Sequence, residues 1–195
     1  MPVKLAVLAS GSGSNFESLI AAEKEGALGG ARIVLLVSDN PEAYALERAK
    51  QHGIPTHVLP VKEGKEAWEK DLVETLLSAD ADWVLLAGFL RILSGDFIRH
   101  FEGRIVNIHP SLLPKYGGRG YYGLRVHEAV LAHGEKESGA SVHFVIEGCD
   151  EGPVILQEKV PVMPGDTSEE LQQRVLRVEH TLYPEAVRRL VKGEV

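Results

Sequence analysis

The sequence predicts an α/β protein in which a doubly wound, mainly parallel sheet carries an antiparallel extension near the C-terminus. Short runs such as Leu5–Ala9 and Trp83–Ala87 are apolar at every position, which is typical of strands buried on both faces of a parallel sheet. These runs alternate with stretches such as Lys65–Leu77, whose apolar residues recur at helical spacing. After His109 the alternation stops, and a segment rich in Pro and Gly precedes two strand-like runs joined by a turn.

The first part of the chain is expected to supply five strands and the helices between them. The strands are expected at Leu5–Ala9, Arg32–Val37, Thr56–Leu59, Trp83–Ala87 and Arg104–Ile108. The helices are expected at about Asn15–Glu25, Ala43–Gln51, Lys65–Leu77 and Phe97–Phe101. Right-handed crossovers between these strands build a doubly wound sheet.

The second part begins with a loop that runs to Gly123. A helix is expected at Leu124–Ala132, and strands at Ser141–Ile146 and Val154–Val160. A long helix at Ser168–Lys192 closes the chain, with a kink expected near Pro184. Its start is indicated by Thr167 followed by Glu169 and Glu170, a pattern typical of a capped helix N-terminus.

Composition and charge limit the class of protein. The chain has 195 residues, 44% of them hydrophobic and 25% charged, which suits one ordinary globular domain. A net charge of -7 argues against a broad surface for nucleic acid. The run Leu5–Ala9 is too short for a signal peptide, and Trp83–Leu90 is too short to span a bilayer. We therefore expect a soluble cytoplasmic protein, with no disulfide because Cys149 is the single cysteine.

Three suggestive segments follow predicted strands. They are Ser10–Asn15, Gly88–Leu93 and Asn107–Ser111. In open α/β sheets, ligands bind outside the carboxyl ends of the strands. We therefore expect these segments to meet at one site.

The first segment, Ser10-Gly-Ser-Gly-Ser-Asn15, has the composition of an anion-binding turn. Its two glycines allow a tight turn and a close approach of the backbone to a ligand, which the first amides of the helix would then face. It is not a Walker loop, and it half matches a dinucleotide fingerprint because Phe16 stands where the third Gly belongs. The alternative is a plain strand-to-helix turn with Ser14 or Asn15 as N-cap.

The third segment places Asn107 and His109 two residues apart at a strand end. Residues two apart face the same way along a strand. An amide donor and an imidazole therefore point at one spot, where they could hold an oxyanion while the histidine moves a proton. The alternative is a structural histidine before a Pro turn.

Asp150 lies in the turn between the last two predicted strands. A carboxylate beside His109 could orient the ring or pass a proton, although an ordinary turn Asp is the alternative.

Cys149 has no activating neighbour in sequence, which favours a small buried filler over a nucleophile. His143 faces either the site or a polar surface. His127 and His133 are six residues apart, which does not fit a metal site.

Taken together, these motifs resemble the phosphoribosylglycinamide formyltransferase family over nearly the whole chain. The segments that carry the resemblance are Ser10-Gly-Ser-Gly-Ser-Asn15, Ala87-Gly-Phe-Leu-Arg-Ile-Leu93, Asn107-Ile-His-Pro-Ser-Leu-Leu-Pro114, Ser141-Val-His-Phe144, Asp150-Glu-Gly-Pro-Val-Ile-Leu-Gln157, Gly165-Asp-Thr167 and Glu179-His180. The Asn107–Pro114 segment is specific to folate formyltransferases and their hydrolase relatives. The resemblance implies a Rossmann-like formyltransferase fold.

The resemblance also implies roles for individual residues. The catalytic group would comprise Asn107, His109 and Asp150. The phosphate and ribose of the ribonucleotide would be bound by Gly13, Ser14, Asn15 and Glu179. The folate would be held by Lys65, Leu90, Arg91, Ile92, Leu93 and Asn107, with its pterin against the turn Ile146–Asp150. Two positions depart from the family pattern: Lys65 stands where Arg is frequent, and Gly117 stands where Pro is common.

The implied function is transfer of a formyl group from 10-formyltetrahydrofolate, a consumed cosubstrate, to the amine of glycinamide ribonucleotide in purine synthesis, without a metal. Residues 1–195 would form a single formyltransferase domain. Its halves would be a phosphate-binding part at 1–105 and a catalytic and folate-binding part at 106–195. The protein would act as a monomer or homodimer on these two small molecules, without a nucleic acid or membrane partner.

Three other interpretations stay open. A formyltetrahydrofolate hydrolase uses water in place of the amine, but that class usually carries an extra N-terminal domain, for which there is no room before Leu5. An enzyme that formylates initiator tRNA is disfavoured by the negative charge. A non-catalytic nucleotide-binding regulatory module is supported by Asp39, an acid near the end of the second predicted strand that could bind a ribose.

Overall fold

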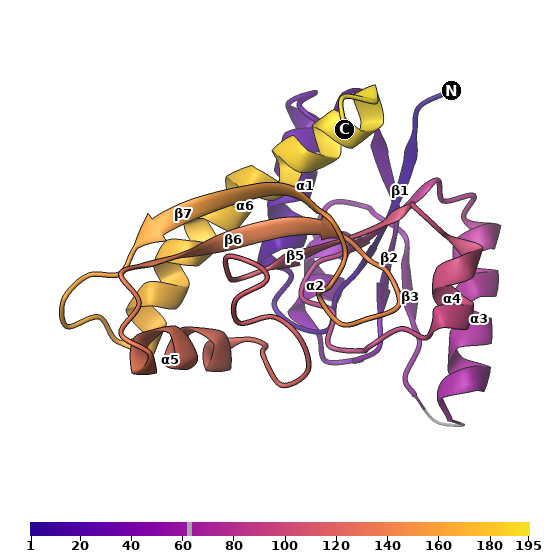
Figure 1. Cartoon of the computed structure of the whole chain (residues 1–195). Helices are drawn as coiled ribbons and strands as arrows, with labels where there is room; N and C mark the ends of the chain where they lie inside the picture. The colour runs from indigo at the N-terminus through magenta and orange to yellow at the C-terminus, as the bar shows by residue number, and fades with distance from the viewer. Residues whose placement is uncertain (62–63) are drawn as a thin grey trace.

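The computed structural model describes residues 1–61 and 64–195 and contains one seven-stranded sheet, with strand order β3-β2-β1-β4-β5-β6-β7 (Figure 1). The strands are β1 (Lys4–Leu8), β2 (Arg32–Ser38), β3 (Thr56–Val58), β4 (Trp83–Leu86), β5 (Ile105–His109), β6 (Glu137–Phe144) and β7 (Val154–Pro161). The helices are α1 (Ser14–Lys24), α2 (Tyr44–Gln51), α3 (Lys65–Ser78), α4 (Gly95–His100), α5 (Leu124–Ala132) and α6 (Ser168–Lys192).

The sheet confirms the predicted fold class. Strands β1 to β5 pair in parallel, whereas β6 pairs antiparallel with β5 and β7 pairs antiparallel with β6. The order reverses at β1, which lies between β2 and β4. Such a switch point leaves a crevice at the carboxyl ends of the two central strands, and this crevice is where the site lies.

Two apolar cores cover the two faces of the sheet. One lies between the sheet and helices α1, α2, α5 and α6, and the other lies between the sheet and helices α3 and α4. The side chains of β1 from Leu5 to Leu8 are fully buried because both faces are covered. Burial of each large apolar side chain contributes about 1.5–3 kcal/mol. The buried hydroxyl of Tyr183 donates to the carbonyls of Leu86 and Val106, which ties α6 to the ends of β4 and β5.

One local expectation and one local alternative are wrong, and one expectation is confirmed. Strand β6 begins at Glu137, four residues before the expected start at Ser141, because Gly139 allows the backbone of Glu158 to approach so closely that a Cβ would collide with its carbonyl. The N-cap of α1 is Gly13, with a φ of 69°, and not Ser14 or Asn15. Helix α6 starts at the expected place, where Thr167 and Glu170 form a capping box.

Within residues 1–61 and 64–195, no helix combines the length and the apolar character that a membrane span requires. The expected kink at Pro184 stays a prediction, since helix α6 continues through that residue.

Candidate active site

A cavity of about 800 Å³ opens at the carboxyl ends of β1, β4 and β5. Its walls include all three segments that the sequence placed at strand ends, namely Gly11–Asn15, Leu86–Leu93 and Asn107–Pro110. Further lining comes from the loop Gly118–Gly123, the segment Ile146–Asp150 and one face of α6. The structure therefore brings the expected site residues together, with the exception of Lys65.

The Ser10–Asn15 loop is held from outside by helix α2. The backbone N–H of Ala45 donates to the Gly11 carbonyl at 3.1 Å, and the Arg48 guanidinium donates to the Ser12 carbonyl at 2.8 Å. Gly13 has a φ of 69°, and a Cβ there would lie 2.7 Å from the Cβ of Ala45. No side chain caps the N-terminus of α1, so its first amides are available to an anion in the cavity.

Beside this loop, Asn15 and Glu179 form a buried polar pair. The Asn15 amide donates to the Glu179 carboxylate at 2.6 Å, and both residues line the cavity. Burial raises the pKa of Glu179, and the hydrogen bond from Asn15 opposes that rise only in part. The Oδ1 atom of Asn15 is buried without a partner. Because unpartnered buried acceptors are rare, this atom is suited to a hydroxyl of a bound ligand.

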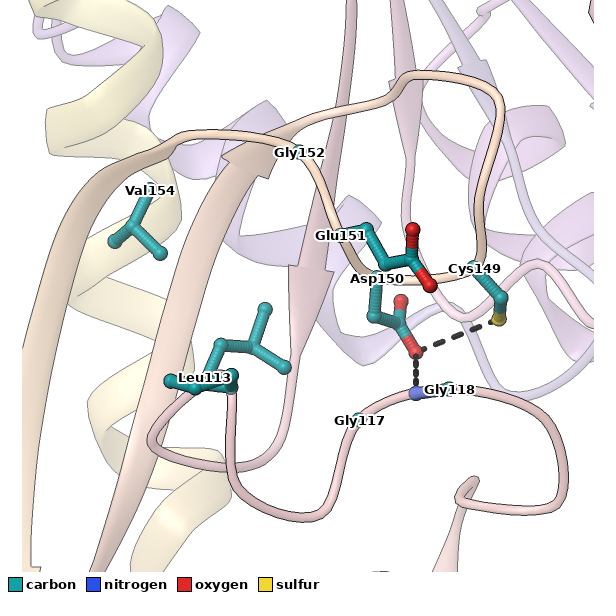
Figure 2. A pocket seen from close by; sticks show the side chains of 9 residues that line it. Leu113, Gly117, Gly118, Cys149, Asp150, Glu151, Gly152 and Val154 are labelled. Carbon is teal, nitrogen blue, oxygen red and sulfur yellow. Dashed lines mark hydrogen bonds between the residues drawn. The ribbon is translucent and has the colours of Figure 1, made fainter.

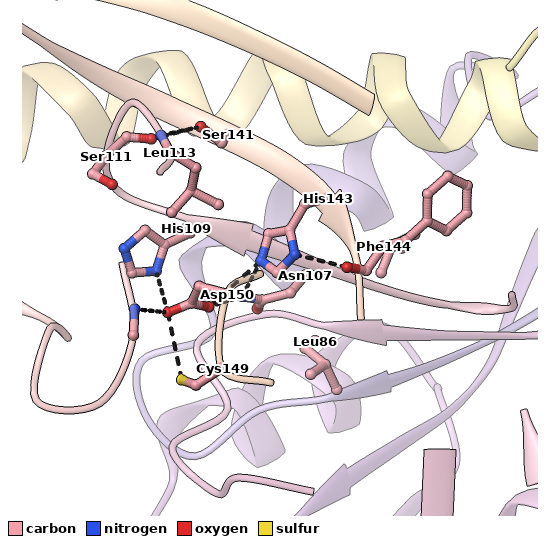
Figure 3. Close-up of polar contacts among 12 residues, drawn as sticks. Leu86, Asn107, His109, Ser111, Leu113, Ser141, His143, Phe144, Cys149 and Asp150 are labelled. Atoms are coloured by element: carbon pink, nitrogen blue, oxygen red, sulfur yellow. Dashed lines mark hydrogen bonds and ion pairs between the residues drawn. The ribbon is translucent and has the colours of Figure 1, made fainter. Parts of the chain in front are cut away.

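The predicted catalytic residues lie within a few ångströms of each other at the other end of the cavity (Figure 3). His109 Nδ1 lies 3.5 Å from Asp150 Oδ2, and Asn107 Nδ2 lies 3.5 Å from Asp150 Oδ1. His143 also faces the site: its Nε2 lies 3.1 Å from Asn107 Nδ2 and 3.5 Å from Asp150 Oδ1. The alternative of a polar surface for His143 is therefore wrong.

Backbone carbonyls fix the protons on both histidine rings. His109 Nε2 lies 2.8 Å from the carbonyl oxygen of Tyr116. A carbonyl only accepts, so Nε2 carries the proton and Nδ1 carries the lone pair that faces Asp150. By the same argument, His143 donates from Nδ1 to the Phe144 carbonyl at 2.8 Å. His143 Nε2 therefore accepts from Asn107, whose second N–H makes only a long contact that a substrate oxygen can replace.

The charges of the cluster follow from burial and from its contacts. Burial lowers the pKa of His109, although the charge of Asp150 and the Tyr116 carbonyl oppose this. Burial alone would raise the pKa of Asp150, but its contacts with His143, His109 and the Gly118 N–H together lower it. At neutral pH the site thus holds an ionised carboxylate beside a neutral imidazole. This pair can accept one proton on Nδ1 and keep it next to a negative charge.

The segment between the two ends of the cavity is apolar. Leu90 and Ile92 are 63% and 45% exposed and line the cavity, as does the buried Leu93. Exposed apolar side chains in a concave wall are typical of a site that binds a flat organic ligand. Arg91 also lines the cavity, and its guanidinium donates to Asp39 at 2.7 Å. Asp39, the candidate ribose-binding acid, is thus paired with Arg91.

Two predicted features differ from expectation. Lys65 is exposed at the start of α3, lies 3.8 Å from Glu69 and is not among the described residues that line the cavity. Cys149 is half-buried and lines the cavity, so it is not a core filler. Burial, with a smaller contribution from the charge of Asp150, raises the pKa of its thiol to about 11. The thiol is therefore protonated at neutral pH.

Sequence reasoning missed three members of the site. Tyr116 and Gly118 contact His109 and Asp150 through backbone atoms, which no side-chain motif reveals. His127 lines the cavity from α5, and burial lowers its pKa to about 4. Its place after a Gly-rich loop was the only signal. Across residues 1–61 and 64–195, no group of three His, Cys, Asp or Glu side chains could hold a metal ion.

Comparisons with known proteins agree with this geometry. The sequence profile of the formyl transferase family matches residues 3–187. The chloroplastic phosphoribosylglycinamide formyltransferase of Vigna unguiculata is 46% identical over 194 residues, which are 98% of this chain and 62% of that protein. The phosphoribosylglycinamide formyltransferase of Escherichia coli (strain K12) is 44% identical over 184 residues, 93% of this chain and 84% of that protein.

The comparison with solved structures gives a result that agrees with the names of these two relatives. The crystal structure of glycinamide ribonucleotide transformylase 1 from Symbiobacterium toebii matches with a TM-score of 0.93 and 40% identity, covering 98% of this chain and 89% of that one. The chain thus spans less than two thirds of the Vigna protein but most of the Escherichia coli one.

Proposed function

Because the chain belongs to the formyl transferase family, we propose that it transfers the formyl group of 10-formyltetrahydrofolate to the amine of glycinamide ribonucleotide in purine synthesis. The observation that carries the proposal is the shared cavity. One concave site holds an anion-binding loop, an exposed apolar wall and a buried His–Asp pair. The named relatives are enzymes of this activity.

The acceptor is expected at the α1 end of the cavity. The loop amides around Gly13 and Ser14 would bind the 5′-phosphate, aided by the positive end of the helix dipole. The buried pair of Asn15 and Glu179 would bind the ribose hydroxyls, since it offers a free amide oxygen and a carboxyl group. In this arrangement the amine of the acceptor would point along the cavity toward His109.

The formyl donor is expected along the apolar wall. Leu90, Ile92 and Leu93 would cover one face of the folate, and Ile146, which is exposed and lines the same cavity, would contact its pterin. Arg91 would contribute a cation at the rim. A contact from Lys65 would require its side chain to leave Glu69 and turn toward the cavity.

The reaction we propose is direct transfer without a covalent enzyme intermediate. The amine nitrogen bonds to the formyl carbon, and the carbon–nitrogen bond to the folate then breaks. The amine proton passes to Nδ1 of His109, and this imidazolium N–H and an N–H of Asn107 stabilise the oxyanion. Asp150 stabilises the imidazolium while the proton moves on to the leaving folate nitrogen. Positioning of both substrates supplies much of the acceleration.

The same proposal covers the organisation of the protein. Residues 1–105 would bind the phosphate and supply the apolar wall of the folate site, and residues 106–195 would carry the catalytic groups and the pterin contact, within one domain. We propose a cytoplasmic enzyme that acts as a monomer or homodimer on two small molecules.

One assay tests the activity. The purified chain is incubated with both substrates, and formylated product is measured by mass spectrometry, with Asp150→Asn, which is expected to lose most of the activity, as the matched control. Product that requires both substrates supports the proposal. Formate released at an undiminished rate without acceptor would identify a hydrolase instead, and nucleotide binding without any turnover would identify a regulatory module.

A further inference from the structure

One short segment, Tyr116–Gly118, reaches both members of the catalytic pair through its main chain. The carbonyl of Tyr116 accepts from His109 Nε2 at 2.8 Å, and the N–H of Gly118 donates to Asp150 Oδ2 at 3.0 Å. Figure 2 shows this amide pointing at the Asp150 carboxylate, beside a second, smaller cavity. We call Tyr116–Gly118 the clamp segment, since its position determines which hydrogen bonds the side chains of His109 and Asp150 can form.

The clamp segment has an unusual backbone. Tyr116 has a φ of 55°, in the left-handed region that bulky residues rarely adopt, and Gly118 has a φ of 91°. A Cβ at Gly117 would lie 2.5 Å from a methyl group of Leu113, so a side chain there would require the Leu113 side chain to shift. A strained conformation of this kind persists only where neighbouring contacts hold it.

One neighbour that holds it through a side chain is Glu135, between α5 and β6. The hydroxyl of Tyr116 donates to Glu135 Oε1 at 2.9 Å, and Lys115 donates to the same oxygen at 2.8 Å. The Tyr116 ring also packs against the rings of Tyr121 and His133. Glu135 is not among the described residues that line either cavity, so it is not placed to touch a substrate.

We propose that Glu135 is a positioning residue for the catalytic pair. By holding the Tyr116 hydroxyl it keeps the Tyr116 carbonyl on His109 Nε2 and the Gly118 N–H on Asp150. The neutral His109 ring therefore presents its lone pair from Nδ1, on the side of Asp150. Without this anchor the clamp segment relaxes, and His109 can place its proton on Nδ1 and donate to Asp150. That tautomer has no lone pair where the reaction needs one.

The kinetic arm of the test rests on the function proposed above and compares four single variants. Tyr116→Phe and Glu135→Ala remove the anchoring bond, and each should lower kcat about tenfold, as expected for loss of one hydrogen bond to a charged group. Glu135→Gln keeps an acceptor oxygen and should restore most of kcat. Lys115→Met removes only the other partner of Glu135 and should leave kcat unchanged. The KM of both substrates should be unchanged in all four.

A double variant tests whether the two residues act through one bond. Tyr116→Phe combined with Glu135→Ala should be no slower than either single variant, because two changes that break the same interaction are not additive. Multiplied effects would show two independent roles and would overturn the proposal.

The decisive arm reads the tautomer directly and needs no activity. The ¹⁵N shifts of the His109 ring should report one Nε2–H tautomer in the parent and in Lys115→Met, and an additional Nδ1–H population in Tyr116→Phe and Glu135→Ala. An unchanged tautomer in both anchor variants overturns the proposal, whether or not kcat falls. If the chain formylates no ribonucleotide, the parent protein shows no formyl transfer, but the tautomer shift still appears in Tyr116→Phe and Glu135→Ala. Failure of the proposed function can therefore be distinguished from failure of the positioning role of Glu135.

Discussion

The two ends of the cavity are built from different parts of the protein. At the β1 end, Gly13 and its neighbours offer backbone amides, held in place by Ala45 and Arg48. At the β5 end, the functional groups are buried side chains that face one another across the β5–β6 pair, where Asn107 lies directly opposite His143. Where a helix follows a parallel strand, the backbone amides of its first turn are exposed at the end of the sheet. Two neighbouring antiparallel strands instead place side chains directly opposite one another.

This difference predicts different responses to mutation. The backbone end has little space for added atoms but no titratable group in the loop, so changes there should alter the binding of the acceptor. The side-chain end depends on which atoms hold protons, so changes there should alter the rate of the chemical step. In kinetic terms, we expect the first to appear mainly in KM and the second mainly in kcat.

The largest effects are expected at the side-chain end. His109→Ala, Asn107→Ala and Asp150→Asn should each lower kcat by about a hundredfold or more, as for acid–base and oxyanion groups. Asp150 has a φ of 59°, and Asn tolerates this left-handed conformation, so the last variant removes the charge without straining the turn. Steady-state rates with a fixed acceptor concentration measure the effect. A near-normal rate in Asp150→Asn would show that its charge is not needed.

An intermediate effect is expected at the backbone end. Gly13→Ala should raise the KM of the acceptor about tenfold, the loss expected for one charge-assisted hydrogen bond, because its Cβ would collide with Ala45. The matched control is Gly26→Ala, which has a similar φ of 72° but open space around it. The measurement is KM with the phosphorylated acceptor and with its dephosphorylated form.

The comparison of the two acceptors decides the role of the loop. If the loop binds the phosphate, Gly13→Ala should weaken binding of the phosphorylated acceptor. The dephosphorylated acceptor, which already binds weakly, should keep the same KM. An equal KM for both acceptors in the parent protein would mean that the loop is only a turn, and the contrast between the two ends would lose its basis.

A smaller effect concerns stability and pH. Burial lowers the pKa of His127 from 6.5 to about 4. Between these values the unfolded chain binds a proton that the native chain does not, so stability is lost as the pH falls from 6.5 toward 4. His127→Leu should reduce this loss, although the lowered pKa values of His109 and His180 contribute with the same sign. Urea midpoints at pH 7 and pH 5 measure it, with the exposed His100→Leu as control. If the difference in urea midpoint between pH 7 and pH 5 is the same in His127→Leu as in the parent protein, the argument is contradicted.

The sequence allowed the fold and many of the side chains that meet in the cavity to be predicted, and most of these successes have a local cause. The run Leu5–Ala9 reveals a buried strand because every residue is apolar, and the spacing of Asn107 and His109 reveals their common direction. Tyr116 and Gly118 could not be found, because they act through backbone atoms that every residue carries. The early start of β6 depends on how closely Gly139 approaches Glu158 in the folded sheet. Glu179, 164 residues from Asn15, came from family resemblance alone.

The smallest effect is expected at Cys149, which belongs to neither end's chemistry although it lies beside Asp150. Its Sγ is 3.6 Å from Asp150 Oδ2, and burial together with that negative charge raises the pKa of the thiol to about 11. A thiol is a poor nucleophile without its thiolate form, so the formyl group should not pass through it. Cys149→Ser should keep kcat within about twofold, since it preserves size and a donor to Asp150. Rate measurements, with mass spectrometry of the intact protein during turnover, test this. A formyl adduct on Cys149, together with a rate as low as that of Asp150→Asn, would replace direct transfer by a covalent mechanism and extend the proton-dependent chemistry to a second side chain of the turn.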